Sequence, residues 1–276
     1  MKVIKAEEMG FCIGVKRAFS MVENVRANYQ GRKLYVYGDL AHNQSVMDRV
    51  ASYGFDTVYH ASDVEPGSVV LVRAHGISDS ERKELEARGS EIIDATCPLV
   101  LKNQDLMRSS ELDVILFGIK GHSETVAVEG AARRKYYVVQ DVSDLAEVPN
   151  DRKYRVIVQT TFETHRYEML LEELDRRGIL YIVSNSICMA SERRRASIRA
   201  MKGLVPYIYV IGDPRSANSN ALVKEAFDNG IGSSLVESAD DIRVEDIRGY
   251  ETIGVSAGSS TPDDVIDKAV RRLEEI

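Results

Sequence analysis

The stretch VILFGIKGHSET (residues 114–125) decides the fold, because it joins a short apolar strand to a polar loop. The apolar run stops at Gly118, and the loop after it carries His122 and Glu124. The same order occurs twice more, in LYVYG (34–38) with AHNQS (41–45) and in YIYVIG (207–212) with RSANS (215–219). Short apolar runs of this kind are typical of strands buried on both faces of a parallel sheet. The chain therefore repeats one α/β pattern three times.

A second strand and further helices complete each repeat. The second strands end in polar or small residues: VVLVRAHG (69–76), RVIVQTT (155–161) and TIGVSAGSS (252–260). Helices are expected after them, over Ser80 to Arg88, Glu163 to Arg177 and Pro262 to Glu275, and after each cysteine, over Val15 to Asn28, Leu99 to Ser109 and Ser191 to Met201. Alternating strands and helices predict parallel sheets covered by helices. Ligands bind beyond the carboxyl ends of such strands, where these polar clusters lie.

One cysteine falls in each repeat, at Cys12, Cys97 and Cys188. We predict an α/β protein of three similar domains around one shared centre, to which each domain gives one cysteine and two polar loops. The predicted domains span residues 1–96, 97–187 and 188–276. Two Rossmann-like domains with an insertion are the alternative architecture.

The bulk composition argues against two classes of partner. The formal net charge of −7, with no basic block, argues against nucleic acid. The longest apolar runs, such as LVPYIYVIG (204–212), are shorter than the roughly 20 residues that span a bilayer. No basic and apolar leader precedes Gly10, and an odd number of cysteines favours free thiols over a disulfide framework. We expect a cytoplasmic protein that binds neither a membrane nor nucleic acid.

The cysteines share a local setting that suits a metal ligand. Cys12 lies between two nearby glycines, and Pro98 places Cys97 at or near a helix N-cap. Cys188 also directly precedes a helical stretch, and helix starts stabilise thiolates. Zinc favours a fourth ligand and a short C-x₂₋₄-C pair, which this chain lacks. We favour a four-iron cluster, in which three cysteines leave one iron open for a substrate oxygen. The alternative without a function is three inert buried thiols.

The strand-end loops hold most of the candidate binding residues. Three of the five histidines fall there: His42, His75 and His122. Small polar residues accompany them: Thr160, Thr161, Ser216, Asn218, Ser219, Ser259 and Ser260. Such residues are common in turns and caps, and Asn218 or Ser219 is expected to cap the following helix. Hydroxyls, an amide, imidazoles and helix N-termini together also fit a phosphate or diphosphate. Neither a P-loop nor a dinucleotide fingerprint is found, so nucleotide triphosphates and NAD are not expected.

Glu124 has two interpretations. A carboxylate in the first turn of a helix is favoured by the helix dipole, which needs no function. The functional alternative is a proton donor, whose pKa would be raised by burial beside a negatively charged cluster and substrate.

Taken together, the motifs resemble those of the hydroxymethylbutenyl diphosphate reductases, which catalyse the last step of the methylerythritol phosphate route to isoprenoids. The resemblance covers essentially the whole chain. It rests on GFCIGVKRA (10–18), AHN (41–43), AHG (74–76), DATCPLV (94–100), GHSE (121–124), VQTT (158–161), Cys188, NSN (218–220) and AGSSTP (257–262). It implies a trefoil of three α/β domains around one [4Fe-4S] cluster per chain, with one open iron and the ligands Cys12, Cys97 and Cys188.

The resemblance also implies a substrate and a set of roles. The substrate is an allylic diphosphate, which two electrons and two protons convert to isopentenyl and dimethylallyl diphosphates with loss of water. Glu124 matches the residue that delivers the proton. The substrate pocket, mostly its diphosphate site, matches His42, His75, His122, Thr160, Ser216, Asn218 and Ser260. Ferredoxin or flavodoxin would supply the electrons, because no flavin or nicotinamide site is evident.

Three positions depart from the family pattern. Ala217 stands where a second serine is usual, so one hydroxyl of the diphosphate site is missing. Arg73 replaces a small residue before the AHG motif, and the chain ends at Ile276, whereas many members carry a C-terminal tail. Two alternatives stay open: a three-domain [4Fe-4S] enzyme such as a quinolinate-synthase-like dehydratase, and a binding protein with inert thiols. The set of AHN, AHG and GHSE motifs favours the reductases.

Overall fold

The computed structural model describes residues 1–41, 43–184 and 186–276. Over these residues the strands form three four-stranded sheets, in which all pairing is parallel. The predicted α/β class and the three similar sheets are confirmed. The chain divides into two compact units. Unit one comprises Met1–Asn24, Asp39–Gly54 and Met189–Ile276, and unit two comprises Val25–Gly38 and Phe55–Cys188.

The first sheet belongs to unit two and has the strand order β3-β2-β4-β5. Its strands are β2 (Leu34–Tyr37), β3 (Phe55–Val58), β4 (Val69–Val72) and β5 (Glu91–Asp94). All residues of β2 and β4 are buried, as expected for central strands of a parallel sheet. Tyr35, Val70 and Val72 pack with Leu85 of helix α3 (Asp79–Ala87). The edge strands β3 and β5 are short and mixed in polarity, so the sequence did not signal them.

The second sheet, also in unit two, has the order β7-β6-β8-β9. Its strands are β6 (Asp113–Phe117), β7 (Tyr136–Val139), β8 (Lys153–Val158) and β9 (Leu180–Ser184). The helices around it are α4 (Pro98–Ser109), α5 (Ser123–Glu129) and α6 (Thr164–Arg176). Successive side chains of a strand point to opposite faces. Ile115 and Phe117 therefore share a core with α6, whereas Val114 and Leu116 share one with α4 and α5.

Two buried amides fix α4, the helix that begins after Cys97. Asn103 Nδ2 donates to the carbonyl of Val158 at 2.9 Å. Gln104 Nε2 donates to the carbonyls of Ile77 at 2.8 Å and Ala127 at 2.9 Å. Buried amides that use their donors in this way specify one position of a helix. The start of α4 is thus held against both sheets of unit two.

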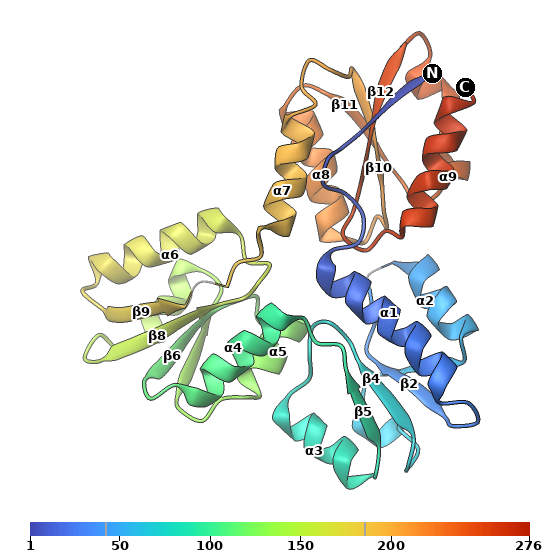
Figure 1. Cartoon of the computed structure of the whole chain (residues 1–276). Helices are drawn as coiled ribbons and strands as arrows, with labels where there is room; N and C mark the ends of the chain where they lie inside the picture. The colour runs from blue at the N-terminus through green and yellow to red at the C-terminus, as the bar shows by residue number, and fades with distance from the viewer. Residues whose placement is uncertain (42, 185) are drawn as a thin grey trace. The chain divides into compact units, whose positions relative to one another are not determined.

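The third sheet belongs to unit one and has the order β1-β12-β10-β11 (Figure 1). Its strands are β1 (Lys2–Lys5), β10 (Tyr207–Ile211), β11 (Gly232–Val236) and β12 (Thr252–Ala257). Its covering helices are α7 (Met189–Arg199), α8 (Ala217–Asp228) and α9 (Asp263–Glu274). Tyr209 and Ile211 face α9, and Ile208 and Val210 face α7 and α8. Both faces are covered, which explains the apolar run YIYVI.

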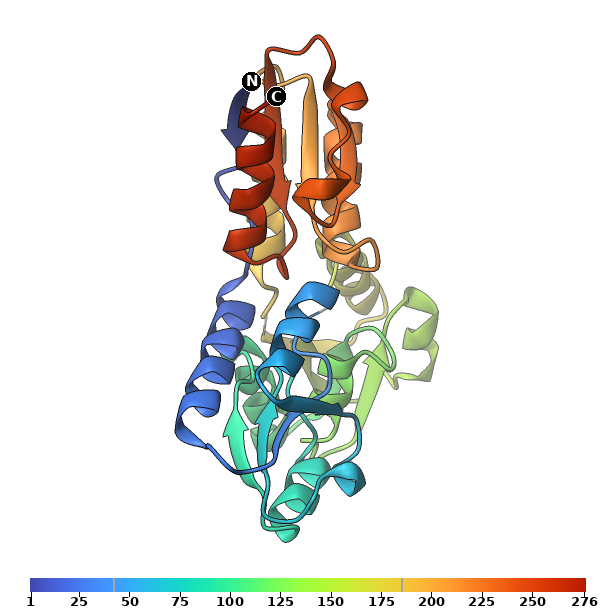
Figure 2. The ribbon, with the colours of Figure 1, turned by 90° about the vertical axis from the view of Figure 1, so that its right-hand side faces the viewer.

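Strand β1 departs from the repeat pattern, because it pairs with β12 and not with the first sheet. The N-terminus of Met1 donates to the carbonyl of Glu274, and both views show the two ends of the chain side by side (Figure 2). Apart from β1, each sheet lies within one of the three predicted domain segments. The domain boundaries and the trefoil arrangement stay predictions.

The remaining elements are short or connect the sheets. They are α1 (Ile13–Asn28), α2 (Gln44–Ser52), η1 (Ala61–Asp63), η2 (Val142–Glu147), η3 (Ala239–Asp241) and η4 (Val244–Ile247). In the described part of the chain, none of the helices has both the length and the apolar character needed to cross a bilayer.

Candidate active site

Each cysteine is held by its backbone N–H at the carboxyl end of a different sheet. The three bonds run from Cys12 to the carbonyl of Ser259 at 3.1 Å, from Cys97 to that of Ala74 at 2.9 Å and from Cys188 to that of Thr160 at 2.6 Å. In every case the accepting residue lies two positions after the end of a strand, namely β12, β4 and β8. The threefold pattern of the sequence is therefore also a threefold hydrogen-bond pattern.

The accepting carbonyls belong to the segments that carry predicted substrate residues. Thr160 is itself such a residue, His75 directly follows Ala74, and Ser260 directly follows Ser259. A backbone hydrogen bond at a strand end leaves little freedom to either partner. Each cysteine is thus fixed relative to one polar residue of the predicted site.

The predicted helix starts at the cysteines are present. Cys97 is the N-cap residue of α4, with proline at the first helical position. The carbonyl of Cys12 accepts from the N–H of Lys16 at 2.9 Å, and the N–H of Val15 lies 3.4 Å from Cys12 Sγ. Cys188 directly precedes α7. Free N–H groups at a helix start favour negative charge on a nearby sulfur.

The three cysteines are half-buried, and none of them forms a disulfide with another. Cys12 lies in unit one, whereas Cys97 and Cys188 lie in unit two. Among the described residues, no three side chains of His, Cys, Asp or Glu gather as a group that could hold a metal ion. Joint ligation of one cluster by these cysteines stays a prediction.

Glu124 lies in the first turn of α5 and is 1% exposed. Its Oε1 accepts from the backbone N–H of Thr160 at 2.7 Å, and its Oε2 accepts from the hydroxyl of Thr160 at 2.7 Å. Burial raises the pKa of the Glu124 carboxyl to about 7, against the opposing effect of both hydrogen bonds. The carboxyl is therefore able to hold and release a proton near neutral pH.

His122 caps the same helix from its N-terminal side. Its Nδ1 accepts from the backbone N–H of Glu124 at 3.1 Å. A neutral His122 consequently carries its proton on Nε2, which can donate to an anion. The ring of His75, which follows β4, stands almost perpendicular to that of His122 with the centroids 5.5 Å apart. Unit two therefore brings together His75 with His122, and Glu124 with Thr160.

Gly118 explains why the strand β6 stops at a glycine. A Cβ at this position would lie 2.8 Å from Thr125 Oγ1, which is closer than side chains tolerate. Oε1 of the buried Gln159 accepts from the backbone N–H of Ile119 at 2.8 Å. The close approach at Gly118 and this bond set the course of the loop that leads to Glu124. Gln159 belongs to the VQTT motif, but the sequence gives no local signal of this structural role.

The carboxyl end of the third sheet carries hydroxyls and an amide. Ser216 is the N-cap of α8, and its hydroxyl accepts from the N–H of Ser219 at 3.3 Å. The expectation that Asn218 or Ser219 caps this helix is wrong, because the helix already begins at Ala217 and both residues lie inside its first turn. Asn218 Oδ1 is buried and has no hydrogen-bond partner among the described residues. Ser260 is also buried.

Two glycines make room for Ser219 at this end of the sheet. Gly212 follows β10 and Gly258 follows β12, and a Cβ on either would overlap Ser219 Oγ. Ser219 is fully buried, and its hydroxyl has no partner among the described residues. The small residues therefore let the start of α8 approach the strand ends closely.

His42, a predicted substrate residue, and Arg73, a departure from the family pattern, come after strands β2 and β4 in the sequence. His42 falls outside the described residues, so its role stays a prediction. The next residue, Asn43, caps α2, because its side-chain oxygen accepts from the N–H of Val46 at 3.2 Å. The guanidinium of Arg73 lies against Gly38, where a side chain would overlap it. The unusual Arg73 thus occupies space that the glycine leaves empty.

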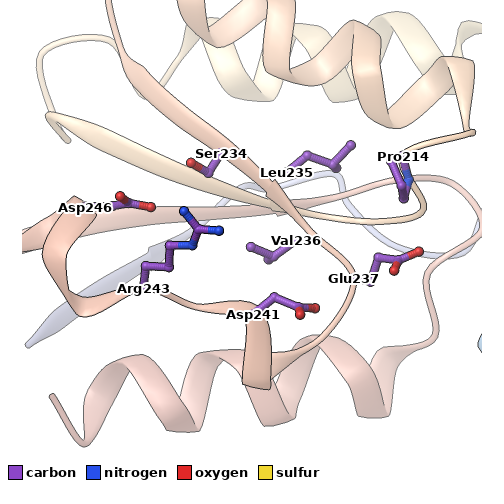
Figure 3. A pocket seen from close by; sticks show the side chains of 8 residues that line it. All are labelled: Pro214, Ser234, Leu235, Val236, Glu237, Asp241, Arg243 and Asp246. Atoms are coloured by element: carbon purple, nitrogen blue, oxygen red, sulfur yellow. The ribbon is translucent and has the colours of Figure 1, made fainter.

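A cavity of about 430 Å³ lies elsewhere in unit one (Figure 3). It is lined by Pro214, Ser234, Leu235, Val236, Glu237, Asp241, Arg243 and Asp246. None of these residues belongs to the predicted site. The cavity therefore adds nothing to the assignment of the active site.

Comparison with known proteins agrees with the resemblance. The sequence model of the family described as "LytB protein" matches residues 3–274. The 4-hydroxy-3-methylbut-2-enyl diphosphate reductase of Treponema denticola is 36% identical, with 100% of each chain covered. The reductase of the same name from Caldanaerobacter subterraneus subsp. tengcongensis is 32% identical, with 100% of this chain and 98% of the relative covered.

Solved structures show the same similarity in three dimensions. The structure of (E)-4-hydroxy-3-methyl-but-2-enyl diphosphate reductase, described as the terminal enzyme of the non-mevalonate pathway, has a TM-score of 0.82 and 30% identity, with 100% of each chain covered. The E-1-hydroxy-2-methyl-but-2-enyl-4-diphosphate reductase from Plasmodium falciparum has a TM-score of 0.85 and 26% identity, with 98% of this chain and 87% of that chain covered.

Proposed function

The chain belongs to the LytB protein family, and we infer that it is a 4-hydroxy-3-methylbut-2-enyl diphosphate reductase, an oxidoreductase of the non-mevalonate isoprenoid pathway. The reaction removes the allylic hydroxyl as water with two electrons and two protons, and yields isopentenyl and dimethylallyl diphosphates. The observation that carries this inference within the chain is Glu124, a buried carboxyl with a pKa of about 7 that binds Thr160, the strand-end residue whose carbonyl accepts from the Cys188 N–H. The alternative of a quinolinate-synthase-like dehydratase is less well supported, because the relatives described above are reductases.

We propose that Cys12, Cys97 and Cys188 hold one [4Fe-4S] cluster. The donor set fits, because none of the three thiols is used in a disulfide and each lies at or directly before a helix start. When bound, the cluster would supply electrons and one open, Lewis-acidic iron. The backbone bonds of the cysteines to three strand-end carbonyls would keep the ligands in place while the polar residues next to them bind substrate.

Glu124 and Thr160 are the proposed source of the proton. Because Glu124 Oε1 accepts from a backbone N–H, a proton on the carboxyl belongs on Oε2, the oxygen that faces the Thr160 hydroxyl. In that state Oε2 donates to Thr160 Oγ1, and the Thr160 hydroxyl is free to donate onward. The pair therefore passes a proton from a buried carboxyl through a hydroxyl, and near pH 7 about half of the carboxyls carry one.

The proposed diphosphate ligands come from both units. In unit two, His122 offers Nε2–H and His75 lies next to it. In unit one, Ser216, Asn218 and Ser260 lie at the N-terminal end of α8 and after β12. Imidazoles and a helix N-terminus provide local positive potential, which a protein of net charge −7 needs in order to hold an anion. His42 is proposed for the same role from the family pattern alone.

Ferredoxin or flavodoxin is the proposed electron donor, and the cytoplasm is the proposed location. The three α/β domains are proposed to span residues 1–96, 97–187 and 188–276, with β1 added to the third.

The proposed function is tested with the anaerobically reconstituted protein and a reduced viologen dye. Oxidation of the dye is followed with and without 4-hydroxy-3-methylbut-2-enyl diphosphate. Oxidation that depends on the substrate, with both expected products, supports the reductase. A sample with four irons per chain that leaves the dye reduced would reject it and bring dehydratase chemistry forward.

A further inference from the structure

Arg194 is a buried arginine in α7 for which the proposed reaction has no role. The residue is 2% exposed, whereas the side chains of its neighbours Arg193 and Arg195 are 54% and 34% exposed. Both neighbours form ion pairs at the surface, with Glu8 and Glu192 respectively. Burying a guanidinium is costly unless its donors are used, so a specific purpose is expected for Arg194.

The guanidinium of Arg194 bridges two backbone segments. Its Nη2 donates to the carbonyl of Gly10 at 2.7 Å, and its Nη1 donates to the carbonyl of Ala190 at 3.0 Å. Gly10 lies two residues before Cys12, and Ala190 lies two residues after Cys188. One buried cation thus fastens the segment that leads into Cys12 to the first turn of the helix that follows Cys188.

The Cys12 segment is also bound along strand β12. Three of its N–H groups donate to carbonyls of every second residue in β12 and the loop after it. The bonds run from Ala6 to Val255 at 2.8 Å, from Gly10 to Ala257 at 3.3 Å and from Cys12 to Ser259 at 3.1 Å. The last of these acceptors, Ser259, directly precedes Ser260, a proposed diphosphate ligand. A change in the path of the segment would therefore move both a cysteine and a substrate residue.

Gly10 is the point at which Arg194 acts on this segment. Its φ of +73° is a left-handed conformation that side chains disfavour, and a Cβ there would lie 2.8 Å from Ile266 Cδ1. The turn at Gly10 directs the carbonyl toward α7, where Arg194 binds it. The backbone conformation and the buried guanidinium therefore depend on each other.

From this geometry we propose that Arg194 is a positioning residue, which fixes Cys12 as a cluster ligand and Ser259–Ser260 as part of the substrate site. The proposal rests on the proposed function, because it assigns Cys12 to the cluster. Its second consequence is electrostatic: the guanidinium places a fixed positive charge two residues from a thiolate that binds an anionic cluster. A nearby cation favours the more negative, reduced state of a cluster.

The test compares three full-length variants after anaerobic reconstitution: Arg194→Met, Arg194→Lys and, as the matched control, Arg195→Met, whose arginine pairs with Glu192 of the same helix. The measurements are iron per chain after gel filtration, the reduction potential of the cluster, and KM and kcat determined separately. Arg194→Met is expected to bind the cluster roughly 10-fold more weakly or worse, as for other outer-shell partners of metal ligands. Any cluster that it retains should have a more negative potential. Arg195→Met should match the wild type in iron and potential.

Arg194→Lys keeps the positive charge but loses the guanidinium that donates to two carbonyls at once. This variant tests the proposal if Arg194→Met does not fold. It should recover the iron content, while KM rises several-fold with kcat nearly unchanged, because Ser260 is held less firmly. A folded Arg194→Met with wild-type iron and potential, or an Arg194→Lys with wild-type KM, would overturn the proposal. Iron content and potential need no substrate, so these outcomes are distinct from a failure of the reductase assay in the wild type.

Discussion

The carboxyl ends of the second and third sheets have the same strand arrangement, but their buried polar groups differ in whether they are hydrogen-bonded. At the second sheet, the two oxygens of the Glu124 carboxyl accept two hydrogen bonds from Thr160. At the third sheet, Asn218 Oδ1 and Ser219 Oγ are buried and find no partner in the described part of the chain. Buried polar atoms are normally paired, so unpaired ones require an explanation.

This difference indicates that the two ends have different roles in the proposed reaction. A closed hydrogen-bond network around a buried carboxyl controls where a proton resides, and needs no ligand to be complete. At the N-terminus of α8 an anion can accept hydrogen bonds from Asn218 Nδ2 and from the buried Ser219 hydroxyl, neither of which is committed to a closed network among the described residues. We therefore propose that the loops of the second sheet supply the proton and, through His122, part of the anion site, whereas those of the third sheet serve anion binding alone.

The largest expected effect concerns the feature that both ends share, the cysteine fixed by its backbone N–H. Cys188→Ser at the second sheet and Cys12→Ser at the third should each reduce iron per chain to near zero, because a hydroxyl is a poor ligand for iron. The backbone bonds to Thr160 and Ser259 do not involve the sulfur, so both variants should remain folded. Iron analysis and circular dichroism check both points. A full iron content in either variant would remove that cysteine from the ligand set.

The second-largest effect is expected on kcat, from a substitution of the proposed proton donor at the second sheet. Glu124→Gln should lower kcat by roughly 10²–10⁴-fold, because an amide cannot deliver the proton, while substrate binding is kept. Glu129→Gln, in the last turn of the same helix, is the matched control and should leave kcat unchanged. Steady-state kinetics of both variants provide the measurement. Near-normal turnover of Glu124→Gln would show that the second sheet does not supply the proton.

The same substitution tests the buried carboxyl through stability. A folded-state pKa of about 7 against an unfolded value of 4.5 means that the fold favours the neutral carboxyl, so stability is lost as pH rises from 4.5 through 7. Glutamine imitates the neutral carboxyl and avoids this loss. At pH 8 the metal-free Glu124→Gln protein should be more stable than the wild type by on the order of 3 kcal/mol. Urea unfolding at several pH values checks this, and a gain that does not disappear below pH 4.5 would contradict the assigned cause.

The sequence predicted the central strands and the helices after the cysteines, because their apolar runs and glycine ends are local signals. It could not predict that β1 joins the third sheet, since KVIK has no feature that selects a partner strand. The positions of Glu124 and the cysteines at strand ends followed from the motifs. The burial of Arg194 did not, because a run of three arginines normally forms a solvated helix face. Its role depends on the carbonyl direction at Gly10, which only the backbone shows.

A smaller effect is expected from the amide at the third sheet. Asn218→Ala should raise KM roughly 10-fold, the size of one hydrogen bond to a charged ligand, and leave kcat nearly unchanged. Asn229→Ala, at the other end of α8, is the control and should keep the wild-type KM. A drop in kcat without a change in KM would mean that Asn218 acts in the chemical step, and the division between the two ends would be lost.

The smallest effect distinguishes a satisfied hydroxyl from an unsatisfied one on the same helix. Ser216 caps α8, so Ser216→Ala should cost about 1 kcal/mol of the free energy of unfolding. Ser219 Oγ is buried without a partner in the described residues, and Ser219→Ala removes a hydroxyl that gains nothing in the ligand-free protein. Its free energy of unfolding should therefore stay within about 0.5 kcal/mol of the wild type, or rise. Urea unfolding of the two metal-free variants side by side provides the measurement. A cost for Ser219→Ala equal to that for Ser216→Ala would mean that this hydroxyl is already bonded, and the third sheet would then be as closed as the second.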